Sequence, residues 1–239
     1  MGRAPSVVTF DGDETLWDFQ GAMRRALEGA AEAFDAAGFT RADGPVTARW
    51  LAEVRETTAA RPELRLARME DIRLTAFEES ARQTGAGPEF ARTVFGAYME
   101  ARHAGVRLYA DSSPCLEALA AMGLRLGLIT NGNSRPDLLG LGDLLAVTVV
   151  AADCGHRKPD PAIYRCAAAR LGVAPEDCVH VGDHITEDVD ASAAAGMRAV
   201  WLVRGGLASP APHAEAAWRT VRTLPELPAL LSEAAGSAP

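Results

Sequence analysis

The sequence has few cysteines, and none of them are paired at metal-binding spacing. The four cysteines lie far apart and form no CxxC motif: Cys115, Cys154, Cys166 and Cys178. This pattern argues against a disulfide framework or a structural zinc site, and it favours reduced thiols in a cytoplasmic protein. The five histidines lack HExxH or any similar spacing, so we assign them no metal.

Long apolar runs and positive charge are also scarce. No run is long enough to span a bilayer, and the opening residues MGRAPSVVTF lack a signal-peptide core. The chain has 24 basic against 32 acidic residues, a net charge of −8. A nucleic-acid or membrane-surface binder needs a basic face, so we expect neither kind of partner. An anionic ligand would need a locally concentrated positive charge or a metal ion.

Lysine is almost absent. Lys158 is the only lysine in the chain, and every other basic residue except histidine is arginine. An ammonium is a compact point charge, whereas a guanidinium is a wide planar fork, so the two do not replace each other in a tight site. Lys158 is therefore a candidate functional residue.

Two kinds of pattern divide the chain. Apolar residues recur at helical spacing in four stretches, residues 19–38, 46–60, 65–85 and 88–105, with no strand pattern between them. Strand-like runs occur at residues 6–10, 124–130, 146–152, 177–183 and 198–203. From residue 113 onward they alternate with short helical segments at residues 113–123, 137–145, 162–172 and 186–196. Alternation of this kind predicts an α/β fold: a Rossmann-like parallel sheet with helices on both faces.

The first strand stands apart from the other strands in sequence and must rejoin their sheet. We therefore expect residues 1–16 and 106–239 to form the core, and residues 17–105 to form an inserted α-helical bundle, or cap. Trp17 and Trp50 are expected to be packing residues, and Glu14 and Asp18 to belong to a helix cap or a solvated turn.

Reactive side chains follow four predicted strands. Ligands of parallel α/β sheets bind beyond the carboxyl ends of the strands, so these side chains should meet in space. They are Asp11 and Asp13, Thr130 with Asn131 and Gly132, Lys158, and Asp183 followed by Asp188. Several carboxylates together repel one another unless a cation compensates, and hard oxygen ligands suit Mg²⁺. A hydroxyl, a lysine and backbone N–H groups near Gly12 and Gly132 would then surround an anion, an arrangement suited to phosphoryl transfer through an aspartyl-phosphate.

The segments DGDET, LITNGN, KPDPAIY and GDHITEDV, in this order, resemble the four motifs of the haloacid dehalogenase-like (HAD) hydrolases, and the helical insertion resembles the C1-type cap of that family. The resemblance implies that Asp11 is the nucleophile and a metal ligand. It also implies that Asp13 is the acid and base, with a main-chain carbonyl on Mg²⁺. Thr130 and Lys158 would bind phosphoryl oxygens, Asp183 would complete the metal shell, and Asp188 would be a ligand or a partner of Lys158.

This resemblance predicts a Mg²⁺-dependent phosphatase of a small phosphorylated metabolite. Members that displace halide need no acid for the leaving group and typically lack the second aspartate, so Asp13 disfavours dehalogenation. A sugar phosphomutase and a non-catalytic phospho-ligand sensor remain alternatives. The sequence identifies neither the ester nor the oligomeric state.

Arginines gather in the predicted insertion. Arg55, Arg61, Arg65, Arg68 and Arg73 lie close together in sequence, and a solvated or salt-bridged helix face is the expectation for them. A functional alternative is that one or two of them, with Arg65 and Arg68 as candidates, bind a carboxylate or second phosphate of the substrate.

Overall fold

The computed structural model describes residues 4–64, 67–132, 136–205 and 214–236 of the chain. It divides into two compact units: one comprises residues 1–18 and 107–239, and the other residues 19–106. Of the described helices, none is both long and apolar enough to cross a membrane.

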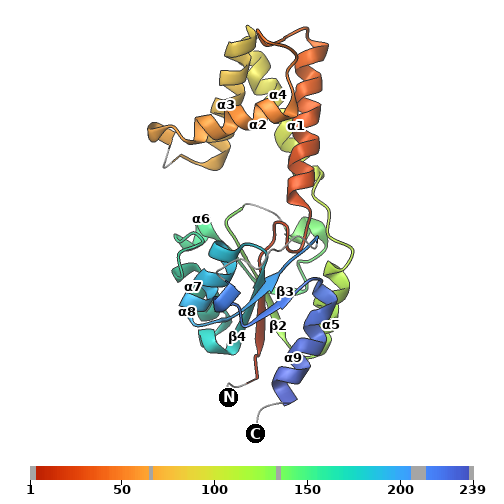
Figure 1. Cartoon of the computed structure of the whole chain (residues 1–239), viewed down its shortest axis with the longest axis vertical. Coiled ribbons are helices and arrows are strands. Elements are labelled where there is room, and N and C mark those ends of the chain that lie inside the picture. Colours follow the sequence, from red (N-terminus) through yellow and green to blue (C-terminus); the bar gives the residue numbers. More distant parts are fainter. Residues whose placement is uncertain (1–3, 65–66, 133–135, 206–213, 237–239) are drawn as a thin grey trace. The chain divides into compact units, whose positions relative to one another are not determined.

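The first unit is built on a parallel sheet of six strands in the order β3-β2-β1-β4-β5-β6. Figure 1 shows α7 (Ala162–Leu171) and α8 (Ala191–Ala195) on one side of it, and α5 (Ser112–Ala121) and α9 (Leu227–Gly236) on the other. The α/β, Rossmann-like fold is therefore confirmed. The strands are β1 (Val7–Phe10), β2 (Arg125–Thr130), β3 (Leu145–Val150), β4 (Cys178–Gly182), β5 (Arg198–Leu202) and β6 (Arg219–Val221).

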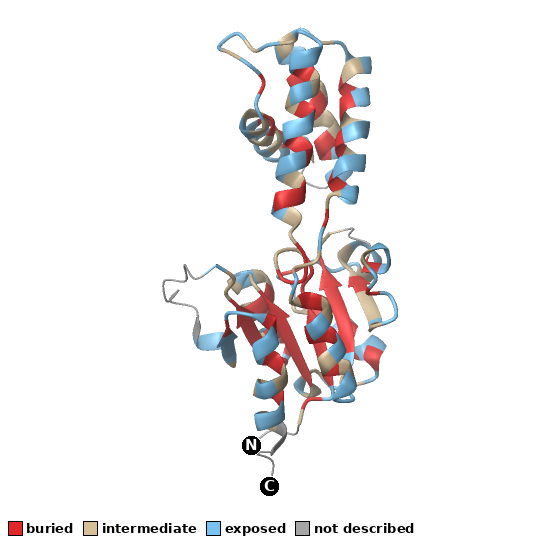
Figure 2. Ribbon diagram, turned by 90° about the vertical axis from the view of Figure 1, so that its right-hand side faces the viewer, coloured by how far each residue is buried: buried red, intermediate tan, exposed pale blue. Residues whose placement is uncertain are grey.

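The central strands form the core of this unit. Every residue of β1 and β4 is buried, as Figure 2 shows in red, because both faces of the sheet are covered by helices. Phe10 of β1 pairs with Leu128 of β2 on one side and with Val181 of β4 on the other. This register brings the carboxyl ends of the three strands to one edge of the sheet. The strand order also reverses direction at β1, and such a switch point is where α/β sheets bind ligands.

Three segments of this unit differ from the sequence-based expectation. The segment 137–145 was expected to be helical, but it contains a short 3₁₀ turn (Pro136–Leu139) and the start of β3. Strand β6 and helix α9 were not predicted. The strand has only three residues, two of them exposed, so it carries no apolar run.

The second unit is a bundle of four helices. They are α1 (Phe19–Ala36), α2 (Ala48–Ala59), α3 (Met69–Thr84) and α4 (Pro88–Ala104). The expected signals fix several ends: Thr47 caps α2 by accepting from the Trp50 N–H at 3.2 Å, and α3 ends at Gly85 with a φ of 77°. The buried core contains Phe34, Phe77 and Tyr98, with Phe34 edge-on to Phe90 at 5.0 Å between ring centroids.

The boundary between the units lies up to two residues from the expected one. Trp17 was assigned to the insertion, but it lies in the first unit, fully buried. Its backbone bridges to Asp13 and to Leu108, and the Asp18 N–H donates to the Arg107 carbonyl at 2.9 Å. These pairings tie residues 17 and 18 to the segment that returns to the sheet.

Candidate active site

Lys158 is the centre of a buried ionic cluster. Its Nζ donates to Asp11 Oδ1 and to Asp188 Oδ1, each at 2.7 Å. Only 2% of Lys158 and of Asp188 is exposed, and 9% of Asp11. Asp11 follows β1, Lys158 lies in the loop before α7, and Asp188 lies in a π-helical turn (Ile185–Asp190) after β4. The structure thus brings together three candidate residues from distant parts of the sequence.

Asp183 completes a group of three carboxylates. Asp11, Asp183 and Asp188 each offer an oxygen, and these oxygens all lie within 4.8 Å of one another. Asp183 follows β4 directly, and its Oδ1 accepts from the Thr15 hydroxyl at 3.4 Å. Carboxylate oxygens at this spacing are a donor set that suits a hard divalent cation such as Mg²⁺.

The charges of this cluster do not balance within the protein. Burial raises the pKa of Asp11 well above its usual range, and Lys158 only partly opposes this effect. Burial acts on Asp188 in the same direction, but there the Lys158 ammonium outweighs it and lowers the pKa of Asp188. One ammonium neutralises one carboxylate, so the site lacks positive charge. The residues present therefore fit a bound metal cation.

Burial, followed by the neighbouring Asp188 charge, raises the pKa of Asp183 to about 6. A cation binds the carboxylate form, so Asp183 must lose its proton when metal binds. We expect Mg²⁺ affinity to fall as the pH drops below about 6, by up to tenfold per pH unit for each ligand carboxyl that takes up a proton. Isothermal titration calorimetry with Mg²⁺ between pH 5 and 7.5 measures this affinity. Repeating it in two buffers of different ionisation enthalpy detects the released proton.

The effect of this pKa shift on the stability of the fold follows from proton linkage. The folded-state pKa of Asp183 lies above its ordinary value of 3.8, so the folded protein binds more protons than the unfolded chain between these values. The contribution of Asp183 to the stability of the metal-free protein therefore decreases as the pH rises through about 6. Mg²⁺ should raise the melting temperature more at pH 7.5 than at pH 5.5, and an equal rise at both would contradict this assignment.

The buried His180 side chain contacts the Asp188 carboxylate. His180 lies on β4 and is 1% exposed, with Nε2 3.4 Å from Asp188 Oδ1 and Nδ1 3.0 Å from the Thr9 hydroxyl oxygen. Burial lowers the pKa of His180, so the ring is neutral, and an ionised carboxylate can only accept. Nε2 therefore carries the proton, and the single Thr9 hydroxyl proton lies between Nδ1 at 3.0 Å and the Val179 carbonyl oxygen at 3.3 Å. Sequence analysis missed this residue because its only signal is one histidine in an apolar strand.

Two glycines allow close approaches at this edge. A Cβ on Gly182 would lie 2.3 Å from Asp188 Cγ, and a Cβ on Gly12 would lie 2.2 Å from the Trp17 ring. Any side chain at either position would displace the residue beside it. Gly12 therefore has a packing role that the sequence did not reveal.

Asn131 and Gly132 follow β2, as expected, and their hydrogen bonds are made to other residues of the first unit. The Asn131 side chain accepts from the Lys158 N–H at 2.8 Å and donates to the Lys158 carbonyl at 3.1 Å and to Glu187 at 3.0 Å. The Gly132 N–H donates to the Thr130 hydroxyl oxygen at 2.9 Å. Asn131 thus holds the loop that carries Lys158, and Thr130 is 1% exposed at the end of β2.

Asp13 is partly buried, and one of its carboxylate oxygens accepts a hydrogen bond. Its Oδ1 accepts from the Trp17 indole N–H at 2.6 Å. Glu14 has a φ of 63°, and its carboxylate accepts from the Tyr109 hydroxyl at 2.9 Å. The turn after β1 is therefore fixed by side-chain contacts within the first unit.

The candidate arginines of the helical unit have different surroundings. Arg65 lies outside the described residues, and Arg68 is exposed just before α3. Arg61 pairs with Glu79 at 3.6 Å. Arg73 is only 8% exposed, so the expected solvated face is wrong for this residue.

Comparison with known proteins identifies the family. Residues 5–196 match the family model described as haloacid dehalogenase-like hydrolase. The chain is 36% identical over 141 residues to the phosphoserine phosphatase of Thermus thermophilus, a match that covers 56% of this chain and 55% of that protein. It is 30% identical to human N-acylneuraminate-9-phosphatase over 67% of this chain and 68% of that one. The chain thus spans only about half the length of the Thermus relative.

A solved structure resembles almost the whole chain. The crystal structure of 2-haloacid dehalogenase from Pseudomonas syringae pv. Tomato DC3000 has a TM-score of 0.75 and 32% sequence identity, covering 96% of this chain and 99% of that one. With the family model covering most of the sequence, these matches have one consequence: the chain belongs to the haloacid dehalogenase-like hydrolases.

Proposed function

We propose that this protein hydrolyses the phosphate monoester of a small metabolite in a Mg²⁺-dependent reaction through an aspartyl-phosphate intermediate. The observation that carries the proposal is the cluster of three carboxylates, two of which bond to a single buried ammonium, at the edge of the sheet where β1 and β4 end. The phosphatase names of the curated relatives support it.

In this proposal, an oxygen of the Asp11 carboxylate attacks phosphorus, and the ester oxygen leaves with a proton from Asp13. Asp13 then takes a proton from water, which attacks the phosphorus of the aspartyl-phosphate and releases inorganic phosphate and Asp11. Lys158 and the Thr130 hydroxyl stabilise the negative oxygens of the phosphoryl group.

Asp11, Asp183 and Asp188, with the main-chain carbonyl of Asp13, would hold Mg²⁺. When bound, the ion supplies the positive charge that the cluster lacks and helps to neutralise the phosphoryl oxygens. Lys158, held by Asn131, fixes the position of Asp11 in the absence of substrate.

Dehalogenation is the second candidate, because a 2-haloacid dehalogenase is similar over nearly the full chain. Asp13 weighs against it. A halide leaves without a proton, whereas an alkoxide needs an acid, and Asp13 stands two residues after the nucleophile. A phosphomutase would return the phosphoryl group to a sugar, and a sensor would bind the ester without turnover.

A panel of phosphate monoesters assayed with and without Mg²⁺, beside 2-chloropropionate and fluoroacetate, tests the proposal. We expect released phosphate that depends on Mg²⁺ and no released halide. Halide release without phosphate release would establish the dehalogenase, and an isomerised sugar phosphate would establish the mutase. Tight binding of an ester without any product would instead support the non-catalytic phospho-ligand sensor.

A further inference from the structure

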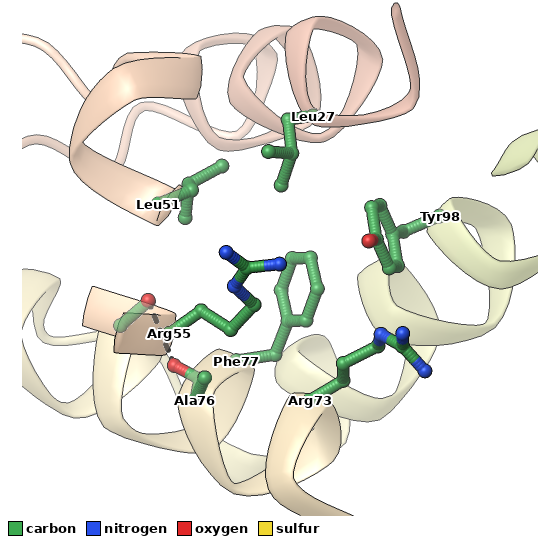
Figure 3. A pocket seen from close by; sticks show the side chains of 8 residues that line it. Leu27, Leu51, Arg55, Arg73, Ala76, Phe77 and Tyr98 are labelled. Carbon is green, nitrogen blue, oxygen red and sulfur yellow. Dashed lines mark hydrogen bonds between the residues drawn. The ribbon is translucent and has the colours of Figure 1, made fainter. Parts of the chain in front are cut away.

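A pocket lies inside the helical unit, lined by residues from all four of its helices. Figure 3 shows the Arg55 side chain reaching between Leu27, Leu51 and Phe77, and Arg73 extending toward Tyr98. The cavity has a volume of about 10 Å³, the space of roughly one water molecule. Its complete lining is Leu27, Leu51, Arg55, Arg73, Ala76, Phe77, Ser80 and Tyr98.

Arg73 is buried without an ion pair to any described residue. It is 8% exposed, its Nε makes no hydrogen bond, and it forms no ion pair with any described residue. Burial, together with the charge of Arg55, lowers the pKa of Arg73, while Tyr98 and the charge of Glu70 oppose the shift. A buried guanidinium with an unsatisfied N–H is costly unless an anion completes it.

Arg55 adds a second guanidinium to the same pocket. Its only ion pair with a described residue is to Glu56, a long contact of 3.6 Å to a side chain that is 70% exposed, and another of its nitrogens contacts Met23 Sδ at 3.5 Å. Beyond these weak contacts, the Arg55 charge is compensated only by solvent, to which 25% of the side chain is exposed. Two cations therefore line one cavity, and no described acidic residue lines it.

We propose that this pocket is an anion site that binds a carboxylate group between Arg55 and Arg73. A guanidinium matches a carboxylate through paired N–H donors, and the Tyr98 hydroxyl offers a further donor. The cavity as it stands has room for about one water molecule, so binding a carboxylate head group requires the partly exposed Arg55 side chain to move outward. Leu27, Leu51 and Phe77 would then contact the carbon atoms of the anion. The same chemistry serves a carboxylate on the substrate or a separate carboxylate effector. The proposal does not rest on the phosphatase assignment.

The direct test is a titration of the full chain with acetate, at constant ionic strength maintained with chloride, followed by NMR of the arginine Nε–H groups. We expect the Arg73 signal to shift and saturate, and Arg55→Gln to weaken acetate binding by about tenfold. The matched control is Arg92→Gln, an exposed arginine of α4, which should bind acetate as the wild type does. No saturable shift in the wild type would overturn the proposal.

Stability gives a second readout. If an uncompensated charge is buried, Arg73→Met should raise the melting temperature of the acetate-free protein and abolish the stabilisation by acetate. An arginine that only packs its stem should instead lose stability when replaced. If Arg73→Met does not fold, the Arg55→Gln titration still decides.

Kinetics separates the two sources of the carboxylate. If the substrate carries it, Arg55→Gln raises KM for phosphate esters with a carboxylate but not for p-nitrophenyl phosphate. If a separate effector carries it, acetate changes the turnover of both esters in the wild type and of neither in Arg55→Gln.

A second, independent observation concerns Trp17. Its indole N–H donates to Asp13 Oδ1 at 2.6 Å, the ring is fully buried, and Gly12 leaves room for it. Given the proposed function, the geometry points to Trp17 as a positioning residue that orients the acid and base Asp13. A tryptophan used only for packing would need no bond to that carboxylate.

Trp17→Phe keeps an aromatic ring and removes the N–H donor. An alkyl phosphate needs its leaving group protonated, whereas p-nitrophenolate leaves without help. We expect kcat/KM, which reports the steps up to departure of the leaving group, to fall about tenfold on the alkyl ester and less than about twofold on p-nitrophenyl phosphate. Trp50→Phe, in the helical unit, is the matched control. Equal losses on both esters would make Trp17 a packing residue, whereas a wild type inactive on both esters would instead count against the phosphatase proposal.

Discussion

Asp11→Asn is expected to abolish phosphate release, lowering kcat by about four orders of magnitude or more, while the protein stays folded. An amide is not a nucleophile toward phosphorus at neutral pH. The replacement has nearly the same shape, and its carbonyl oxygen can still accept from Lys158 Nζ, which lies 2.7 Å from the present Oδ1. Because burial disfavours the Asp11 charge, removing that charge should not lower the melting temperature.

Asp143→Asn, an exposed change in the same unit, is the matched control for this variant and should retain full activity. Asparagine before glycine deamidates readily, and residue 12 is glycine, so the mass of each preparation must be verified. Turnover within tenfold of the wild type in a verified preparation would remove Asp11 from the role of nucleophile.

The second large effect is expected at Lys158. Lys158→Met leaves Asp11 and Asp188 buried without their shared ammonium, so the metal-free protein should lose ~3–5 kcal/mol of stability, and activity should be lost. Mg²⁺ should recover much of the lost stability, because it supplies positive charge to the same carboxylates. Urea unfolding with and without Mg²⁺ measures both effects.

Arg170→Met removes the same charge from an exposed position of α7 and should change stability by less than about 0.5 kcal/mol. Lys158→Arg keeps the charge, but a planar guanidinium does not fit where 2% of the lysine is exposed, so we expect little activity from it. A Lys158→Met protein as stable as the wild type without metal would show that the carboxylates are not ionised together.

The sequence was sufficient to predict the residues of the ionic cluster. Asp11, Lys158, Asp183 and Asp188 each follow a strand-like run, and parallel strands end at one edge of a sheet. The sheet itself followed from the alternation of strands and helices. These signals are local, so a single sequence contains them.

The supporting contacts could not be predicted. Asn131 reaches Lys158 across 27 residues, and His180 reaches Thr9 across 171, by hydrogen bonds that leave no periodic trace in the sequence. Trp17 was expected only to pack, because its bond to Asp13 depends on the irregular turn between them. The burial of Arg73 depends on how four helices pack, and a charged residue on a helix is ordinarily exposed.

The central claim is that Asp11, held at the sheet edge beside Asp183, Asp188 and Lys158, receives the phosphoryl group. Borohydride reduces an aspartyl-phosphate to homoserine, which peptide mass spectrometry locates. With Mg²⁺ and a substrate that turns over, we predict homoserine at position 11, and none in Asp11→Asn. Phosphate release with homoserine at another aspartate, or at none, would contradict the account.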